Sequence, residues 1–348
     1  MTESSRISHT LPKGYQLEDF EIEEVLGIGG FGITYKARDI HLNRPVAIKE
    51  YMPSGMAIRD KEQATVFPAS DSHKDDFEWG LDRFRKEAET LVSFRHPNIV
   101  SVFRFFRSNG TAYLVMEYQD GKSLSEILGA SGTLSEPEIE EILDPLLDGL
   151  EDVHEAGFMH RDIKPANLFI RRDGKPVLID FGAARQALGG HSQALTSIVT
   201  AGYAPYEQYE SDSVQGPWSD IYALGATLYR AVTGQRPVEA PKRAGCVMRG
   251  EPDPNKPASE VVKGKYSARL LSAIDAALNV LEGQRPQSVQ EFRNYLKGVP
   301  KAEAKTAVTA PTGPGTATEG ATLYVGGSAA GPSGVSGPTA ATAPPAPP

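Results

Sequence analysis

The chain has 348 residues, a formal net charge of −9 and 40% hydrophobic residues. Its length exceeds the usual size of one domain and its composition allows a proper core, so a two-lobed body or two domains are expected. The acidic balance argues against a general nucleic-acid-binding protein, because phosphate neutralisation needs clustered lysine and arginine.

Cysteine content and hydropathy indicate in which cellular compartment the chain is expected. The single cysteine, Cys246, excludes an internal disulfide framework and fits a reducing compartment. The N-terminus "MTESSRISHT" lacks the pattern of a signal peptide, and no run of about 18 apolar residues could span a membrane. We therefore expect a cytoplasmic chain without a membrane span.

Apolar and polar residues alternate in several segments of the first third of the chain, which is typical of half-buried strands. A helix is expected over 75–94, where Phe84, Ala88 and Leu91 recur at helical spacing. The predicted strands are 20–26, 32–39, 44–51, 99–106 and 112–118.

After residue 120 the pattern becomes mostly helical, so an α+β fold is expected. A helix over 135–157 begins at the capping residue Ser135, and a short hairpin is expected over 168–180. The predicted organisation is a leader over 1–19, a strand-rich N-lobe over 20–118, a mainly helical C-lobe over 119–298 and a tail over 299–348.

The end of the chain differs sharply in composition. Of its last 48 residues, 39 are Ala, Pro, Gly, Thr or Ser and only four are charged. Such a segment cannot bury enough apolar surface to offset its ordering entropy, so a disordered tail is expected. Its threonines raise the hypothesis of a docking strand for a phosphothreonine-reading module, with a plain linker as the simpler alternative.

The stretch "LGIGGFGITYKA" places Gly27, Gly29 and Gly32 in GxGxxG spacing. Alone this spacing is weak, because ordinary turns and two unrelated nucleotide folds share it. A dinucleotide-binding turn must lead into a helix, whereas the segment 33–37 that follows has the pattern of a strand. The context therefore favours a glycine-rich hairpin folded over phosphates, whose N–H groups can approach closely.

Lys49 lies in "PVAIKEY", an otherwise buried strand, where an ammonium group is costly unless it meets fixed anions. Phosphate oxygens and a carboxylate of the following helix would serve. Glu87 is the best candidate for that carboxylate and Glu89 is the alternative, since helix phase alone does not separate them.

The stretch "MHRDIKPANLFI" crowds polar residues between apolar flanks, and "DFG" follows downstream. Chemistry on a triphosphate needs a carboxylate to orient the attacking hydroxyl, for which Asp162 is suited. It also needs a positive charge near the moving phosphoryl group, which Lys164 could supply. Asn167 and Asp180 offer the oxygen ligands that Mg²⁺ prefers. Together these residues predict a site for Mg²⁺-assisted phosphoryl transfer.

In this order, the motifs "GIGGFG", "VAIK", "HPNIV", "HRDIKPAN", "DFG", "APYE", "SDIYALG" and "GQRP" resemble those of bacterial-type serine/threonine protein kinases, over about residues 20–297. The resemblance implies a two-lobed protein kinase fold that uses ATP and Mg²⁺. It also implies protein substrates with serine or threonine acceptors, and a packing role for His160.

By resemblance, Met116 is the gatekeeper, and Glu117 and Tyr118 form the hinge that meets adenine. Ser123 is then placed to reach the ribose. The implied nucleotide contacts are Leu26, Gly27, Gly29, Gly32, Thr34, Ala47, Lys49, Met116, Glu117, Tyr118 and Ser123. The implied catalytic residues are Lys49, Glu87, Asp162, Lys164, Asn167 and Thr200, and the implied metal ligands are Asn167 and Asp180.

Lys164, two residues after Asp162, and Thr200 in "VTAGY" resemble the serine/threonine pattern rather than the tyrosine one. Arg161 beside Asp162 implies control by phosphorylation of the activation segment, since a buried guanidinium favours an anion. The candidate acceptors are Thr196, which is preferred, Ser192 and Ser197.

The sequence departs from the family pattern in three places. Thr34 stands where the family mostly has valine above adenine, a modest loss of apolar contact. "APYE" stands where the family has APE, so Glu207 takes the glutamate position and Arg285 is its expected salt-bridge partner. An insert of roughly 20 residues, "MPSGMAIRDKEQATVFPASDSH", separates Lys49 from Glu87. It is either a partner-docking element or a tolerated surface excursion, because long insertions carry a small entropy penalty.

Two alternative functions belong to other classes. An ATP-binding pseudokinase scaffold usually lacks at least one catalytic or metal-binding residue, and here all of them are present. A small-molecule kinase with the same two lobes would not need an activation segment with Thr200 and Glu207, which resembles a platform for extended peptides.

Overall fold

The computed structural model describes the chain from residue 9 to residue 299, with three internal gaps. All described residues belong to one compact unit, residues 1–302. The three candidate phosphoacceptors and the predicted tail after Val299 lie outside the described residues. The described ranges are 9–60, 64–181, 200–210 and 213–299.

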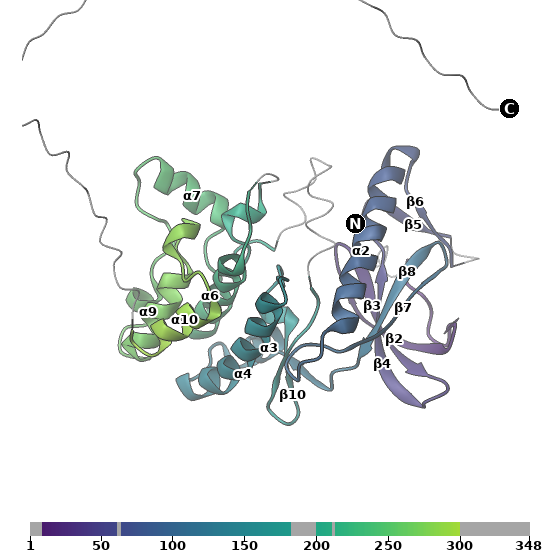
Figure 1. Cartoon of the computed structure of the whole chain (residues 1–348), viewed down its shortest axis with the longest axis horizontal. Helices are drawn as coiled ribbons and strands as arrows, with labels where there is room; N and C mark the ends of the chain where they lie inside the picture. The colour runs from purple at the N-terminus through teal and green to yellow at the C-terminus, as the bar shows by residue number, and fades with distance from the viewer. Residues whose placement is uncertain (1–8, 61–63, 182–199, 211–212, 300–348) are drawn as a thin grey trace, which may run out of the picture. The chain divides into compact units, whose positions relative to one another are not determined.

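Figure 1 shows the strands and helices in chain order. The strands are β1 (Gln16–Leu17), β2 (Phe20–Ile28), β3 (Gly32–Asp39), β4 (Arg44–Tyr51), β5 (Ala57–Arg59), β6 (Val66–Pro68), β7 (Val102–Ser108), β8 (Thr111–Glu117), β9 (Gly121–Ser123), β10 (Leu168–Arg171) and β11 (Pro176–Leu178). The α-helices are α2 (Lys74–Ser93), α3 (Leu124–Ser131), α4 (Glu136–Glu155), α6 (Pro217–Thr233), α7 (Ala240–Met248), α8 (Ala258–Val261), α9 (Ala268–Ala277) and α10 (Val289–Leu296). Short 3₁₀ turns are η1 (Asp71–His73), η2 (Pro165–Asn167), η4 (Tyr206–Gln208) and η5 (Glu282–Gln284).

The first half of the chain builds an antiparallel sheet with strand order β1-β2-β3-β4-β8-β7. Helix α2 packs beside β7 and β8, as Figure 1 shows. Its buried side chains Phe77, Leu81, Phe84 and Ala88 recur every three to four residues, so they form one apolar face. The sheet and α2 therefore share a core, and the helix has a fixed position against β7 and β8.

Strand alternation places Lys49 and Glu50 on opposite faces of β4. The Glu50 side chain is fully buried, where a carboxylate is stable only if it is well bonded. It accepts hydrogen bonds from the hydroxyls of Tyr35 (2.8 Å) and Tyr113 (2.7 Å), and it pairs with Arg59 of the insert. This buried network fixes β4, so the adjacent Lys49 is carried on a rigid strand.

The second half is mainly helical. Helix α6 is buried along most of its length and packs against α9, which in turn packs against α10. The segment after α2 joins the two halves: the Val100 N–H donates to Leu178 O (3.0 Å), and the Leu178 N–H donates to Asn98 O (2.8 Å). These backbone bonds tie the sheet half to β11, directly before the "DFG" segment.

The predicted fold class is confirmed, with a strand-rich first half followed by helices. Helix α2 covers nearly the whole predicted range 75–94, and α4 starts after the predicted cap Ser135. The leader predicted over 1–19 is wrong from Leu11 onward. Leu11 is 1% exposed, its N–H donates to the Tyr35 hydroxyl (3.1 Å), and β1 pairs with β2.

Within the described residues, no helix has both the length and the apolar composition needed to cross a membrane.

Candidate active site

A cavity of about 620 Å³ lies between the sheet and the β10–β11 region. Its walls include every residue of the predicted nucleotide set, together with Lys164, Asn167 and Asp180. Residues that lie up to 154 positions apart, from Leu26 to Asp180, therefore surround one space.

The three glycines of the GxGxxG spacing have different reasons to be glycine. A Cβ at Gly32 would lie 2.1 Å from Glu50 O, so the close approach of β3 and β4 excludes any side chain there. A Cβ at Gly27 would meet nothing within 4 Å, and one at Gly29 would make only ordinary contact with Gly32 O at 3.6 Å. Packing does not require glycine at Gly27 or Gly29, so the space beside these two residues remains open to the cavity.

Lys49 meets two carboxylates at the cavity wall. Its Nζ is 3.9 Å from Glu87 Oε1, and it also pairs with Asp180 Oδ1. Glu89, the alternative partner, is exposed and pairs with Arg85 on the helix surface. The geometry therefore selects Glu87, whose side chain is only 2% exposed.

Asp162 is the centre of a hydrogen-bonded cluster. Its carboxylate accepts from Thr200 Oγ1 (3.1 Å) and from Asn167 Nδ2 (2.6 Å), and it pairs with Lys164 Nζ (2.9 Å). Lys164 Nζ also donates to Thr200 Oγ1 (3.2 Å). The structure brings together four predicted catalytic residues, and these bonds connect the Asp162 carboxylate to Lys164 and Asn167, which line the cavity.

Asn167 and Asp180 both line the cavity and carry side-chain oxygen atoms. The Asn167 amide nitrogen donates to Asp162, both to its carboxylate and to its carbonyl oxygen (2.9 Å), so its amide oxygen is the atom left for a ligand. Asp180 has φ +64°, a region that non-glycine residues rarely adopt. Such strain is found mainly where a side chain must be aimed, as at a binding site.

Asp220 organises the loop that carries the "HRDIKPAN" motif, although the sequence identified it only as part of "SDIYALG". Its fully buried carboxylate accepts from the backbone N–H groups of His160 (2.8 Å) and Arg161 (2.7 Å), and it contacts His154 Nε2 (2.9 Å). Burial alone would raise the pKa of Asp220, but these hydrogen bonds and the neighbouring histidines hold it below its usual value. An acidic residue in an otherwise apolar helix was the available signal.

His160 is a buried packing residue rather than an acid–base group at the cavity. Its Nε2 lies 3.0 Å from Ile179 O, its Nδ1 accepts from the Asp162 N–H (3.3 Å), and its ring contacts Phe181 at 4.4 Å. These partners require the neutral tautomer with the proton on Nε2. Burial lowers the pKa of His160, which keeps the ring neutral.

A pH dependence of stability follows from His160. The unfolded chain protonates this histidine near pH 6.5 and the folded protein does so only at lower pH, so acidification favours unfolding. We expect the unfolding free energy to fall between pH 7 and about pH 5.5, by at most about 1.4 kcal/mol per pH unit from this group. Urea titrations should give a smaller fall in His160→Gln, and equal slopes would contradict this assignment.

Ser123 was expected to reach the ribose, but in the structure its hydroxyl is hydrogen-bonded within the protein. Its hydroxyl donates to Glu126 Oε2 (2.8 Å) and accepts from the Glu126 N–H (3.2 Å), so it caps helix α3. Glu126 also lines the cavity and was missed. The spacing S-x-x-E of a capping box would have identified it.

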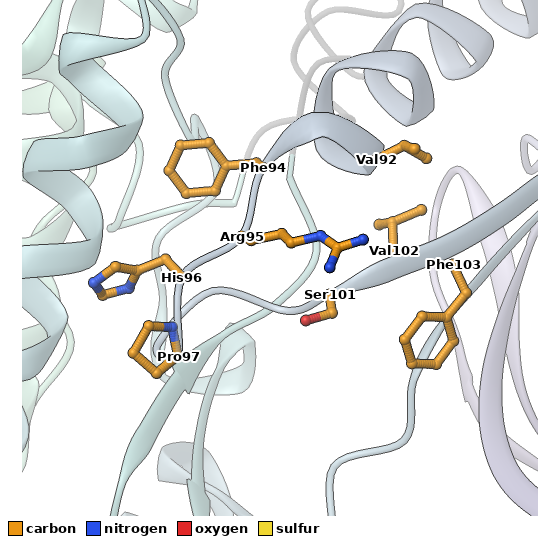
Figure 2. Close-up of a pocket in the computed structure, with 8 residues that line it drawn as sticks. All are labelled: Val92, Phe94, Arg95, His96, Pro97, Ser101, Val102 and Phe103. Carbon is orange, nitrogen blue, oxygen red and sulfur yellow. The ribbon is translucent and has the colours of Figure 1, made fainter.

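A second cavity, of about 380 Å³, lies between the end of α2 and β7. Figure 2 shows Arg95 pointing toward Val102 while Phe94 and His96 project the other way. It contains one guanidinium and no carboxylate, so it lacks the charges that phosphoryl chemistry needs. Its lining residues are Val92, Phe94, Arg95, His96, Pro97, Ser101, Val102 and Phe103.

The departure "APYE" keeps its predicted anchor. Arg285 donates to Glu207 from its two terminal nitrogens, with Nη1–Oε1 at 2.7 Å and Nη2–Oε2 at 3.2 Å. The two side chains are almost completely buried, at 0% and 5% exposure. The end of the activation segment is thus held against the helical half.

Comparisons with known proteins agree with this geometry. The model of the protein kinase domain family matches residues 20–292. Serine/threonine-protein kinase PknA from Nostoc sp. is 33% identical over 294 residues, which are 80% of this chain and 47% of that protein. Serine/threonine-protein kinase PknB from Mycobacterium tuberculosis is 32% identical over 298 residues, 83% of this chain and 44% of that protein.

A solved structure titled "PpkA-294 apo form" superimposes with a TM-score of 0.74 at 37% identity, covering 83% of this chain and 99% of that one. The chain therefore belongs to the protein kinase family, and within it to the bacterial-type serine/threonine protein kinases. It spans about half the length of the curated relatives that it matches.

Proposed function

We propose that the chain transfers the γ-phosphoryl group of ATP to serine and threonine hydroxyls of protein substrates. The observation that carries this proposal is the Asp162–Lys164–Thr200 cluster, whose Lys164 lines the same cavity as the glycine-rich loop and Lys49. A pseudokinase scaffold has no specific observation in its favour.

Each side chain has a role that follows from its surroundings. Asp162 would orient the acceptor hydroxyl and accept its proton, because Thr200 and Lys164 hold its carboxylate in place. Lys164 would stabilise negative charge on the transferring group, which is the main need of phosphoryl transfer. Lys49, kept extended by Glu87, would hold the ATP phosphates.

The donor set at the cavity also fits Mg²⁺. Asn167 and Asp180 both line the cavity and offer hard oxygen ligands. Mg²⁺ usually takes one or two protein oxygens and fills its remaining positions with phosphate oxygens and water. Among the described residues, no group of three or more His, Cys, Asp or Glu side chains could hold a metal alone. When bound, the ion would neutralise charge on the phosphate oxygens.

We also propose that phosphorylation of the activation segment controls the site through Arg161. The guanidinium is largely buried, which lowers its pKa, and within the described residues its Nε has no hydrogen-bond partner. Arg161 also has φ +66°, so the side chain is aimed by a strained backbone. A phosphate on residues 182–199 would supply the missing acceptor.

The direct test is to incubate the purified chain with labelled ATP, Mg²⁺ and a generic basic protein. We expect label on phosphoserine and phosphothreonine, and a loss of about 10²-fold or more in Lys49→Met, which removes the charge that holds the phosphates. Nucleotide binding without any labelled protein would instead support the scaffold. Mass spectrometry of the same sample tests the control mechanism, because full activity with an unmodified segment 182–199 would contradict it.

A further inference from the structure

The insert between β4 and α2 is firmly attached to the sheet half. Its strands β5 and β6 form a hairpin, from which Arg59 reaches the buried Glu50 with only 3% of its side chain exposed. Arg59 Nε also donates to His9 O (2.7 Å), and the Val66 N–H donates to Asn109 O (2.8 Å) in the β7–β8 turn. A hairpin with buried ionic and backbone bonds is a rigid support rather than a loose excursion.

The start of the insert reaches the tip of the glycine-rich loop. The Ser54 N–H donates to Gly30 O (2.8 Å), and the Met52 N–H donates to Phe31 O (3.0 Å). The Phe31 ring is only 8% exposed and packs with Met56, which is 9% exposed, and with Trp79 of α2. This apolar cluster is separate from the main core, so it links the insert, the loop tip and α2 and little else.

These contacts matter because the loop would otherwise be free to move. Its tip, residues 29–32, consists of three glycines and Phe31, and glycine loses more backbone entropy on ordering than any other residue. Fixing the one side chain and two carbonyl groups of this tip removes most of that freedom. Trp79 lies two turns before Glu87 on the same helix, so the cluster also connects the loop to the partner of Lys49.

We propose that the insert is a clasp that holds the glycine-rich loop over the ATP phosphates, with Met56 and Phe31 as its positioning residues. This role rests on the proposed function, since it assumes that the cavity binds ATP. In this role the insert would act on the site, in contrast to a tolerated surface excursion or a partner-docking element. Met56 acts through the loop and does not line the cavity itself.

The test is Met56→Ala, which removes the side chain between the insert and Phe31. We expect KM for ATP to rise about three- to tenfold with a smaller change in kcat, because the closed loop becomes less populated. Hydrogen exchange of residues 26–32 should speed up in the same variant. Met56→Leu should restore both values, and Ile58→Ala is the matched control, since Ile58 lies two residues further along the same insert but is 47% exposed.

Nucleotide affinity is measured directly with a fluorescent ATP analogue, so that the clasp is tested even if phosphoryl transfer were absent. Unchanged affinity and unchanged loop exchange in Met56→Ala, with only a lower Tm, would overturn the proposal and leave the insert a stabilising element. Should Met56→Ala fail to fold, Trp79→Leu tests the same cluster from α2, with the same expected rise and the same contradicting result.

Discussion

Replacing Asp162 by asparagine is expected to lower kcat by about 10²–10⁴-fold, with ATP binding retained. The carboxylate accepts hydrogen bonds from Thr200 and Asn167 and pairs with Lys164. An asparagine of the same shape can still accept from Asn167 and can donate to Thr200, so the fold should persist. It cannot accept the proton of an incoming hydroxyl, and this single loss removes the general base.

The measurement compares steady-state transfer to a peptide at saturating ATP with nucleotide affinity from calorimetry. Asp173→Asn is the matched control, because Asp173 is an exposed turn residue whose oxygen accepts from the Lys175 N–H, a bond that asparagine can also make. Near-normal turnover of Asp162→Asn would remove the role assigned to Asp162. An equal loss in both variants would point to general damage instead.

Local sequence patterns predicted most of the strands and helices, because the spacing of apolar residues shows which face of a strand or helix is buried. Strand β4 and helix α2 could be predicted from the order of apolar residues alone. The choice between Glu87 and Glu89 required more, since the sequence pattern did not fix the rotation of the helix precisely enough to show which of them faces Lys49. Only the packing of Phe84 and Ala88 against the sheet fixes the rotation that turns Glu87 toward Lys49.

The features that the sequence could not predict depend on contacts between distant segments. Leu11 lies in a stretch with proline and glycine that resembles a loop, and its burial requires the Tyr35 side of the sheet. Strands β5 and β6 have three residues each, too short for an alternation to be detected. The partner of Arg59 is a glutamate that faces away from the cavity, which a linear pattern does not reveal.

The residues of the candidate site were better predicted than the residues that hold them in place. Lys49, Asp162 and Asn167 could be recognised because each lies among apolar residues. Burying a polar group there costs free energy, so its presence indicates a functional site. Asp220 supports the catalytic loop through backbone N–H groups, which every residue has, so nothing in the loop sequence identifies that partner. An acidic residue in an apolar helix marks Asp220 as unusual, but the N–H groups that it binds are known only once the fold is known.

Replacing Arg285 by alanine is expected to have the largest effect on stability, a loss of about 3–5 kcal/mol in the unfolding free energy. The substitution leaves Glu207 charged and buried, with Ser219 as its remaining hydrogen-bond donor (2.7 Å). It also removes the donors to Asn279 O and Val280 O, each at 2.7 Å. Urea unfolding followed by circular dichroism measures the change.

A matched control separates this buried pair from an ordinary surface pair. Arg269 pairs with Glu140 at 2.8 Å, but both side chains are more than half exposed, so Arg269→Ala should cost only about 0–1 kcal/mol. The double variant Arg285→Met with Glu207→Met should recover part of the loss, because no uncompensated charge remains buried. Similar losses in Arg285→Ala and Arg269→Ala would show that the pair does not anchor the activation segment. Only seven positions separate Thr200 from Glu207, so we expect phosphoryl transfer to fall in Arg285→Ala as well. A large loss in stability with unchanged activity would show that catalysis does not depend on this anchor.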